Sequence, residues 1–415
     1  MLLVRTTVVV QGRTKVSESA DSHSVRCLRC RAVAQVSLPA QTGQTGGSSS
    51  DELARSLESA LSQGKIRKAH DLLIEILKSP YISSDTLLRV GIQFAEQERY
   101  EEAAEAFERC IQEHPGVFEA YYNLALTKIA EQKWEDALAT LQQAPQKSRS
   151  EVLACSYLRG KIEGSQGNAS QAEHDLSAAF AGEPQNPAYG MDLGLFYIQE
   201  HKYREAAAVF EGARNRNPGS SFLVLGLALS RFLAGQHARS IDALRKLLST
   251  QPNFSPARVL MTFVLSAQGK LEEADRVARD GLNSPHASPY LYYLDASVLV
   301  KLQSRQYKRI FEELSLARRG IPSCSLCYLT ESKAHQAQGN LGAAIADLEM
   351  ATQIDPTLSE GWYRLAFLYR RVGRSADASR AQHRFQELRT EKEGREVQML
   401  RDNFLQTLSA AQPAQ

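Results

Sequence analysis

The chain has 415 residues, of which 43% are hydrophobic and 23% charged, and its formal net charge is +2. A balance this close to zero gives no reason to expect a nucleic-acid or membrane partner. No run of about 18 apolar residues is present, so the sequence predicts no membrane-spanning helix. Six cysteines are too few for a disulfide framework in a chain of this length.

Residues 1–49 differ in composition from the rest of the chain. They contain six Arg or Lys, two acids and many Ser and Thr, and they lead into the stretch QTGQTGGSSS, which is typical of a linker. We expect this leader to be disordered. Its basic, acid-poor composition also suits organelle import, whereas Arg5 interrupts the apolar start that a secretory signal needs. A cytoplasmic location is favoured, and an exported or organellar location is the alternative if the leader is a targeting segment.

From residue 50 onward the sequence repeats with a period of 34 residues. Prolines mark the end of successive units, and Pro184, Pro218 and Pro252 are each 34 residues apart. Two helical patterns flank a short polar turn in each unit, which predicts an antiparallel helix hairpin. We expect distortion near residues 303–306, where one unit has two extra residues. The predicted units are 50–83, 84–117, 118–152, 153–186, 187–220, 221–254, 255–288, 289–324, 325–358 and 359–392.

Small residues recur on the facing sides of the two helices of each unit. They predict a close approach of the two backbones, with Phe107 and Phe210 among the large residues that fill the next layer. The small residues are Gly91, Ala125, Gly160, Gly194, Ala228, Ala296 and Ala366 in the first helices, and Ala69, Ala103, Ala137, Ala172, Ala206, Ala274, Ala344 and Ala378 in the second.

The best unit, 187–220, matches the pattern W-x-x-L-G-x-x-Y followed by A, F, A and P. Its matching residues are Leu193, Gly194, Tyr197, Tyr203, Ala206, Phe210, Ala213 and Pro218. The chain therefore resembles the tetratricopeptide repeat family over residues 50–392. The resemblance implies an all-α, right-handed α-solenoid of about ten helix-turn-helix units. It also implies that the first helices line a concave groove that holds a peptide or a partner's helix.

Carrying the family's groove positions over to this chain predicts a lining rich in aromatic residues, which favours apolar or aromatic anchors on a partner protein. Some family members clamp a peptide's terminal carboxylate with Lys and Asn, but Leu88 and Ile92 replace them here, so we reject that interpretation. The predicted lining is Arg89, Tyr122, Asn123, Tyr157, Lys161, Asp192, Leu195, Phe222, Phe232, Phe263, Tyr290, Tyr293, Lys333, Tyr363 and Arg364.

Residues 393–412 predict one more helix, which is amphipathic. Val397, Leu400, Phe404 and Leu408 lie on one of its faces. Because a repeat array needs a terminal element that covers its last apolar face, we expect this helix to cap the last unit. A partner-binding amphipathic helix is the alternative.

No motif for catalysis or cofactor binding is present. HExxH, GxSxG, GxxxxGK[ST] and GxGxxG are absent, and the nine histidines are scattered over different units. We interpret the CxxC pair Cys324/Cys327 as packing residues rather than a metal or redox site. A second pair, Cys27/Cys30, lies in the leader that we expect to be disordered, so a metal site shared by the two pairs is not favoured. Residues 364–395 contain nine Arg or Lys and four acids, which we interpret as a solvated surface.

The sequence therefore predicts a non-enzymatic scaffold that binds a protein or peptide partner in its groove, without a cofactor, a metal or nucleic acid. The alternative is an assembly or envelope-associated factor that acts outside the cytoplasm.

Overall fold

A computed structural model describes residues 49–80, 82–284, 287–388 and 394–410, and these ranges contain twenty-one α-helices and no strand. The predicted disordered leader, residues 1–49, lies outside the described residues except for its last residue, which begins the first helix.

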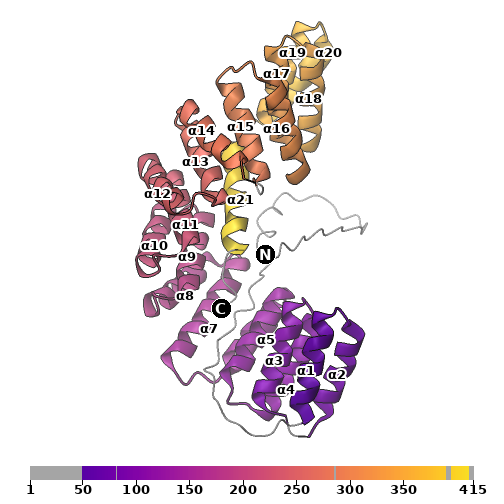
Figure 1. Cartoon of the computed structure of the whole chain (residues 1–415), viewed down its shortest axis with the longest axis vertical. Coiled ribbons are helices and arrows are strands. Elements are labelled where there is room, and N and C mark those ends of the chain that lie inside the picture. The colour runs from indigo at the N-terminus through magenta and orange to yellow at the C-terminus, as the bar shows by residue number, and fades with distance from the viewer. Residues whose placement is uncertain (1–48, 81, 285–286, 389–393, 411–415) are drawn as a thin grey trace.

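The first twenty helices form ten consecutive pairs, which confirms the predicted all-α solenoid of about ten hairpins. The pairs follow one another along an arc (Figure 1). They are α1 (Ser49–Ser62) with α2 (Ile66–Lys78), α3 (Ser84–Glu96) with α4 (Tyr100–Glu113), α5 (Phe118–Ala130) with α6 (Trp134–Gln143), α7 (Arg149–Ser165) with α8 (Ala169–Gly182), α9 (Pro187–Gln199) with α10 (Tyr203–Arg216), α11 (Ser221–Leu233) with α12 (His237–Thr250), α13 (Ser255–Ala267) with α14 (Leu271–Leu282), α15 (Pro289–Lys301) with α16 (Tyr307–Gly320), α17 (Ser325–Ala337) with α18 (Leu341–Ile354), and α19 (Ser359–Arg371) with α20 (Ser375–Glu387).

One helix begins earlier than the predicted unit boundary at residue 153. Helix α7 starts at Arg149 because Ser148 and Glu151 form a capping box. The Ser148 hydroxyl accepts a hydrogen bond from the Glu151 amide at 3.2 Å, and the Glu151 carboxylate accepts one from the Ser148 amide at 2.8 Å. The preceding helix, α6, ends two residues before Pro145, which disfavours helical geometry in the residue that it follows.

The turn inside each pair contains one residue with a positive φ. Six of these residues are glycines, and the other four are Glu98, Gln132, His201 and Gln303, with φ between 52° and 61°. Nine of the turns have three residues, whereas the turn between α15 and α16 has five. The two extra residues predicted near 303–306 are thus accommodated in a longer turn, and the helices on both sides remain continuous.

Glycines in the first helices let large rings enter the core. Phe210 is fully buried, and a Cβ atom on Gly194 or Gly226 would lie 2.4 or 2.5 Å from its ring. Gly91 faces Phe107 in the same way, at 2.4 Å. The predicted role of the small residues, close packing of neighbouring helices, is confirmed at Gly91 and Gly194, and Gly226, which was not among the predicted residues, has the same role.

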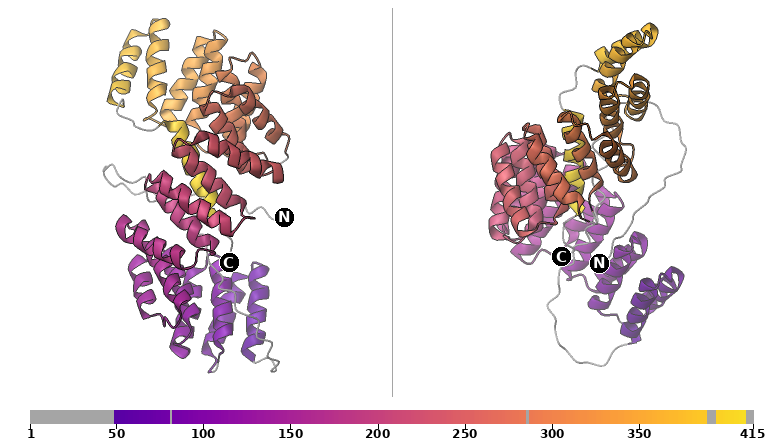
Figure 2. Two further views of the ribbon diagram at one scale, coloured as in Figure 1. Left: turned by 90° about the vertical axis from the view of Figure 1, so that its left-hand side faces the viewer. Right: turned by 45° about the horizontal axis from the view of Figure 1, so that its top comes forward.

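The last helix, α21 (Arg395–Ala410), does not cap the last unit, so that prediction was wrong. Its main packing partners are α9 and α11, in the middle of the array, rather than α19 and α20. Figures 1 and 2 both show this helix, in yellow, beside the middle units. The outer residues of α20 include Ser375, Ser379, Arg380 and His383, all exposed. Because this face is polar, it offers no apolar surface for α21 to cover, and the apolar face of α21 packs elsewhere.

Candidate functional site: the inner surface and its internal helix

The first helices of the middle units already hold a helix. We call the part of α9, α11 and α15 that contacts α21 the inner surface. Leu400, Phe404 and Leu408 follow one another at four-residue spacing on α21, and none of them is more than 1% exposed. Together with Leu405, they belong to the same apolar core as the residues of the array. The inner surface therefore accommodates the apolar face of an amphipathic helix.

Polar contacts hold the start of α21. Glu396 accepts a hydrogen bond from the Tyr293 hydroxyl at 3.3 Å and lies 3.6 Å from the Lys301 ammonium, and both partners belong to α15. The pKa of Tyr293 lies well above its ordinary value, mainly because the phenol is buried and also because the Glu396 carboxylate is close. The phenol therefore keeps the proton that it donates. Arg395 is 3.6 Å from the Asp355 carboxylate, in the segment that leads into α19. These contacts define the register of α21 along the inner surface.

A second polar cluster joins α7 to α9. The Tyr157 hydroxyl donates a hydrogen bond to the Asp192 carboxylate, and the Lys161 ammonium lies 2.9 Å from the same carboxylate. The ammonium is also 5.2 Å from the centre of the Tyr157 ring, within the range of a cation–π contact. All three residues were predicted to line the groove. The structure brings them together, and their contacts with one another connect the fourth pair to the fifth.

The other predicted groove residues differ in how much of their surface is open. Tyr122, Asn123, Leu195, Phe232, Phe263 and Tyr293 are each less than a tenth exposed. Phe222, Tyr290, Arg89, Lys333 and Arg364 are half-buried. Tyr363 is 54% exposed. Whether any of them contacts a partner stays a prediction.

An open aromatic pair lies at the end of the array. Tyr293 and Tyr363 are each the fifth residue of a thirteen-residue first helix, α15 and α19. Tyr293 is 3% exposed and contacts α21, whereas Tyr363 is 54% exposed. Phe367, one helical turn further along α19, is 51% exposed and was absent from the predicted lining. Its spacing from Tyr363 was the signal that could have identified it.

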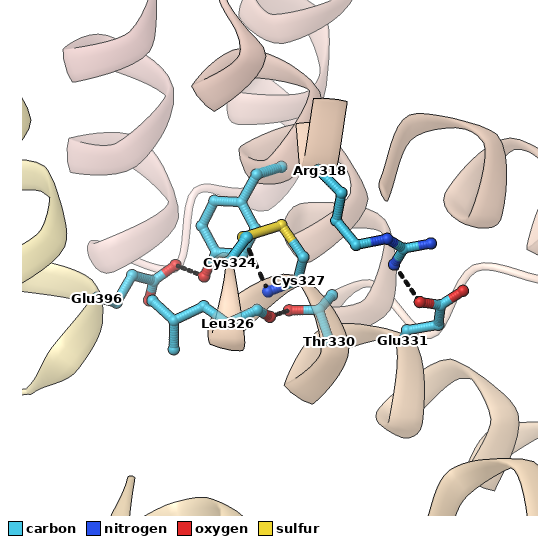
Figure 3. Close-up of a disulfide and its surroundings, with 8 residues drawn as sticks. Arg318, Cys324, Leu326, Cys327, Thr330, Glu331 and Glu396 are labelled. Carbon is cyan, nitrogen blue, oxygen red and sulfur yellow. Dashed lines mark hydrogen bonds and ion pairs between the residues drawn. A yellow bond between two sulfur atoms is a disulfide. The ribbon is translucent and has the colours of Figure 1, made fainter. Parts of the chain in front are cut away.

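Cys324 and Cys327 form a disulfide (Figure 3), so the prediction that they are simple packing residues is wrong. Cys324 is the N-cap of α17 and Cys327 is three residues later. This placement brings their Cα atoms to 5.3 Å, within the span of a disulfide. Both residues are buried. Cys27 and Cys30 lie outside the described residues.

Three carboxyl groups meet one arginine between α14, α15 and α16. The Arg309 guanidinium donates to Glu313 at 2.8 Å and to Asp295, and it lies 3.6 Å from Asp275. Asp295 is fully buried and Glu313 is 7% exposed. The pKa of Glu313 is raised to about 8, mainly because the carboxyl group is buried and also because Asp295 is close. This cluster lies inside the array, where its carboxyl groups are engaged with Arg309.

Several of the late basic residues are already paired. Arg374 donates to Asp377 at 2.6 Å, and Arg364 donates to Glu360 at 2.8 Å. These ion pairs are consistent with the predicted solvated surface. Among the described residues, no cluster of His, Cys, Asp and Glu is suited to hold a metal ion, and none of the described helices is both long and apolar enough to cross a membrane.

Comparisons with known proteins identify the repeats. Two family models, each described as a tetratricopeptide repeat, match this chain, one over residues 94–162 and the other over residues 57–116, 157–221 and 192–256. Superkiller complex protein 3 from Mus musculus is 28% identical over 124 residues, which cover 30% of this chain and 8% of that protein. The chain thus spans less than a tenth of the length of this relative.

Two solved structures are similar in fold. A tetratricopeptide repeat protein from Parabacteroides merdae ATCC 43184 has 16% identity and a TM-score of 0.45, with 60% of this chain and 98% of that chain covered. PilW, a widely conserved type IV pilus biogenesis factor, has 15% identity and a TM-score of 0.42, with 52% of this chain and 100% of that chain covered.

Proposed function

We propose that this chain, a tetratricopeptide repeat protein, is a binding scaffold that holds a segment of a partner protein against the first helices of its repeats. The observation that carries the proposal is the position of α21. Its three residues Leu400, Phe404 and Leu408 are buried, and the helices α9 and α11 that α21 contacts lie far earlier in the sequence, which supports a surface suited to helical ligands.

The open end of the array supports the same proposal. Tyr363 and Phe367 are both about half exposed on α19, at spacing that places them on one face of the helix. Aromatic side chains offer a large contact area at low entropic cost, so exposed pairs of this kind are favourable anchors for a partner. The polar clusters described above are engaged within the array, which favours a binding role over a catalytic one.

A photo-crosslinking experiment tests the scaffold proposal. A benzophenone amino acid replaces Phe367 in one variant and Met350 in a control, whose side chain is 41% exposed on the second helix α18. Both positions are on the surface, so neither replacement removes a buried contact. We expect the Phe367 variant to crosslink to a defined protein in lysate of the source organism, and the Met350 variant not to do so. Equal crosslinking from both positions, or none from Phe367, would contradict the proposal.

A second candidate function is favoured by the disulfide. Cys324–Cys327 suits an oxidising compartment, because the cytosol of most organisms keeps thiols reduced. It supports an assembly or envelope-associated factor that acts outside the cytoplasm. Mass spectrometry of the natural protein, alkylated at lysis, tests this candidate through the state of both cysteines and the position of the N-terminus. Two alkylated cysteines and an intact Met1 would rule it out.

A further inference from the structure

We infer that α21 is a displaceable occupant of the inner surface, and that the partner presents an amphipathic helix with the same pattern of side chains. This inference rests on the proposed function and names the class of ligand. The pattern is an acidic residue followed by apolar residues at four-residue intervals, which in α21 are Glu396, Leu400, Phe404 and Leu408. A partner helix of this kind and α21 cannot bind at the same time, because both need the same surface.

The pattern follows from the contacts. The three apolar residues are buried against the array, and Glu396, one turn before them, meets Tyr293 and Lys301. An acidic side chain at this place satisfies a buried phenol and faces a cation, whereas a basic one would face Lys301 unfavourably. The inner surface therefore distinguishes helices by charge at one end and by apolar shape along the rest.

The array does not need α21 to be complete. Its twenty other helices are already paired, and the outer face of α20 is polar. Helix α21 is packed on one side only, since Asp402, Gln406 and Ala410 are exposed. Its ion pair with Lys301 is partly open to solvent, with the two side chains 29% and 39% exposed, so water and salt weaken it. These features fit a ligand tethered to its own site better than a permanent part of the core.

Occupation by α21 lowers the apparent affinity for a partner. A tethered ligand acts at a high effective concentration, so the surface is open only in the fraction of molecules from which α21 has detached. The apparent dissociation constant of a partner is its intrinsic value divided by that fraction. Loosening α21 must therefore strengthen binding in trans, even though no residue of the inner surface has changed.

A fluorescein-labelled peptide of residues 395–410 tests the inference by fluorescence anisotropy. The full-length wild-type chain is compared with a full-length Phe404→Asp/Leu408→Asp variant, in which α21 loses its apolar contacts. We expect the variant to bind the peptide at least about tenfold more tightly than the wild type. Equal affinities would overturn the inference. A peptide carrying the same two substitutions is the control and should not bind.

A charge exchange tests the register. In the double variant, Lys301→Glu should weaken binding of the natural peptide by about twofold to fivefold, and a Glu396→Lys peptide should lose a similar factor on the unchanged surface. The two substitutions together should restore binding. Losses that simply add would show that residues 301 and 396 do not face each other in the complex, and they would overturn the inference.

Hydrogen exchange of the wild-type chain keeps the test valid if the double variant does not fold. Saturating peptide should remove protection from the amides of residues 395–410 of the chain and leave α9 and α11 protected. Unchanged protection of those amides would identify α21 as a permanent part of the fold. In that case the scaffold proposal would still stand if Phe367 crosslinks a partner, so the two proposals fail separately.

Discussion

The buried carboxyl cluster predicts that the stability of this protein falls as the pH rises from mildly acidic to mildly basic. Three carboxyl groups, of Asp275, Asp295 and Glu313, lie among two guanidinium groups, of Arg309 and the nearby Arg279, so the cluster is neutral when the Asp295–Glu313 pair holds one proton; burial raises the pKa of both members of that pair. A protonated Glu313 also donates a hydrogen bond to Asp295. Ionisation of Glu313 would leave one uncompensated negative charge in the interior.

The direction and size of the effect follow from the pKa of Glu313. It is raised from 4.5 to about 8 in the folded chain, so between these values the folded state binds a proton that the unfolded state releases. The free energy of unfolding then falls by about 1.4 kcal/mol for each unit of pH. Glu313→Gln removes this proton and keeps an amide that can donate to Asp295. The stability of the variant relative to the wild type should thus rise by about 4 kcal/mol from about pH 5 to about pH 8.

Urea unfolding followed by circular dichroism at several pH values measures this difference. Because repeat arrays can unfold in parts, hydrogen exchange of α15 and α16 supplies the local reading. Glu312→Gln is the matched control: Glu312 is adjacent in sequence and its side chain is 63% exposed, so it should leave the pH dependence unchanged. Parallel pH profiles for the wild type and Glu313→Gln would refute the assignment of a proton to this cluster.

Three further predictions concern the packing and the turns. Gly194→Ala should destabilise the fold by about 1–3 kcal/mol, because the new methyl group meets the buried ring of Phe210. Gly212→Ala should be neutral or stabilising, because the nearest atom to its new methyl group is 3.6 Å away. Equal melting temperatures for the two variants would contradict this prediction. Glu98→Gly should stabilise the chain by about 1 kcal/mol in urea unfolding, because it relieves a positive φ of 60°; a loss of stability would contradict it. Burial raises the pKa of the Cys110 thiol to about 12 and that of the Cys155 thiol to about 11. Iodoacetamide at neutral pH should therefore modify the two thiols only after unfolding. Rapid labelling of the native chain would argue against their burial.

The repeats could be predicted because each unit carries its own local signals. The 34-residue period, the small residues and the prolines all indicate the same hairpin, and neighbouring hairpins need only each other to bury their apolar faces. The two extra residues in the eighth unit were recognisable for the same reason. The early start of α7 depends on the reciprocal contacts of Ser148 and Glu151, a local signal that the 34-residue period alone does not reveal.

The position of α21 could not be predicted from its own sequence. Amphipathicity shows that Leu400 and Phe404 need an apolar surface, but it does not say which of several surfaces offers the best fit. The decisive information lies elsewhere, in the polar outer face of α20 and in the positions of Tyr293 and Lys301 on α15. Likewise, Cys324 and Cys327 formed a recognisable pair, but only the start of α17 at residue 325 shows how close they lie.

The same reasoning limits what a groove prediction can mean. Tyr293 and Tyr363 occupy the same position in their repeats, and the family pattern assigns both to the groove. One is buried at 3% exposure beside α21, and the other is 54% exposed at the end of the array. Position within the repeat therefore determines which way a side chain points, whereas its availability to a partner depends on what already lies on the surface. In this chain that occupant is its own last helix, so the strength with which α21 is held controls how much of the surface a partner can reach.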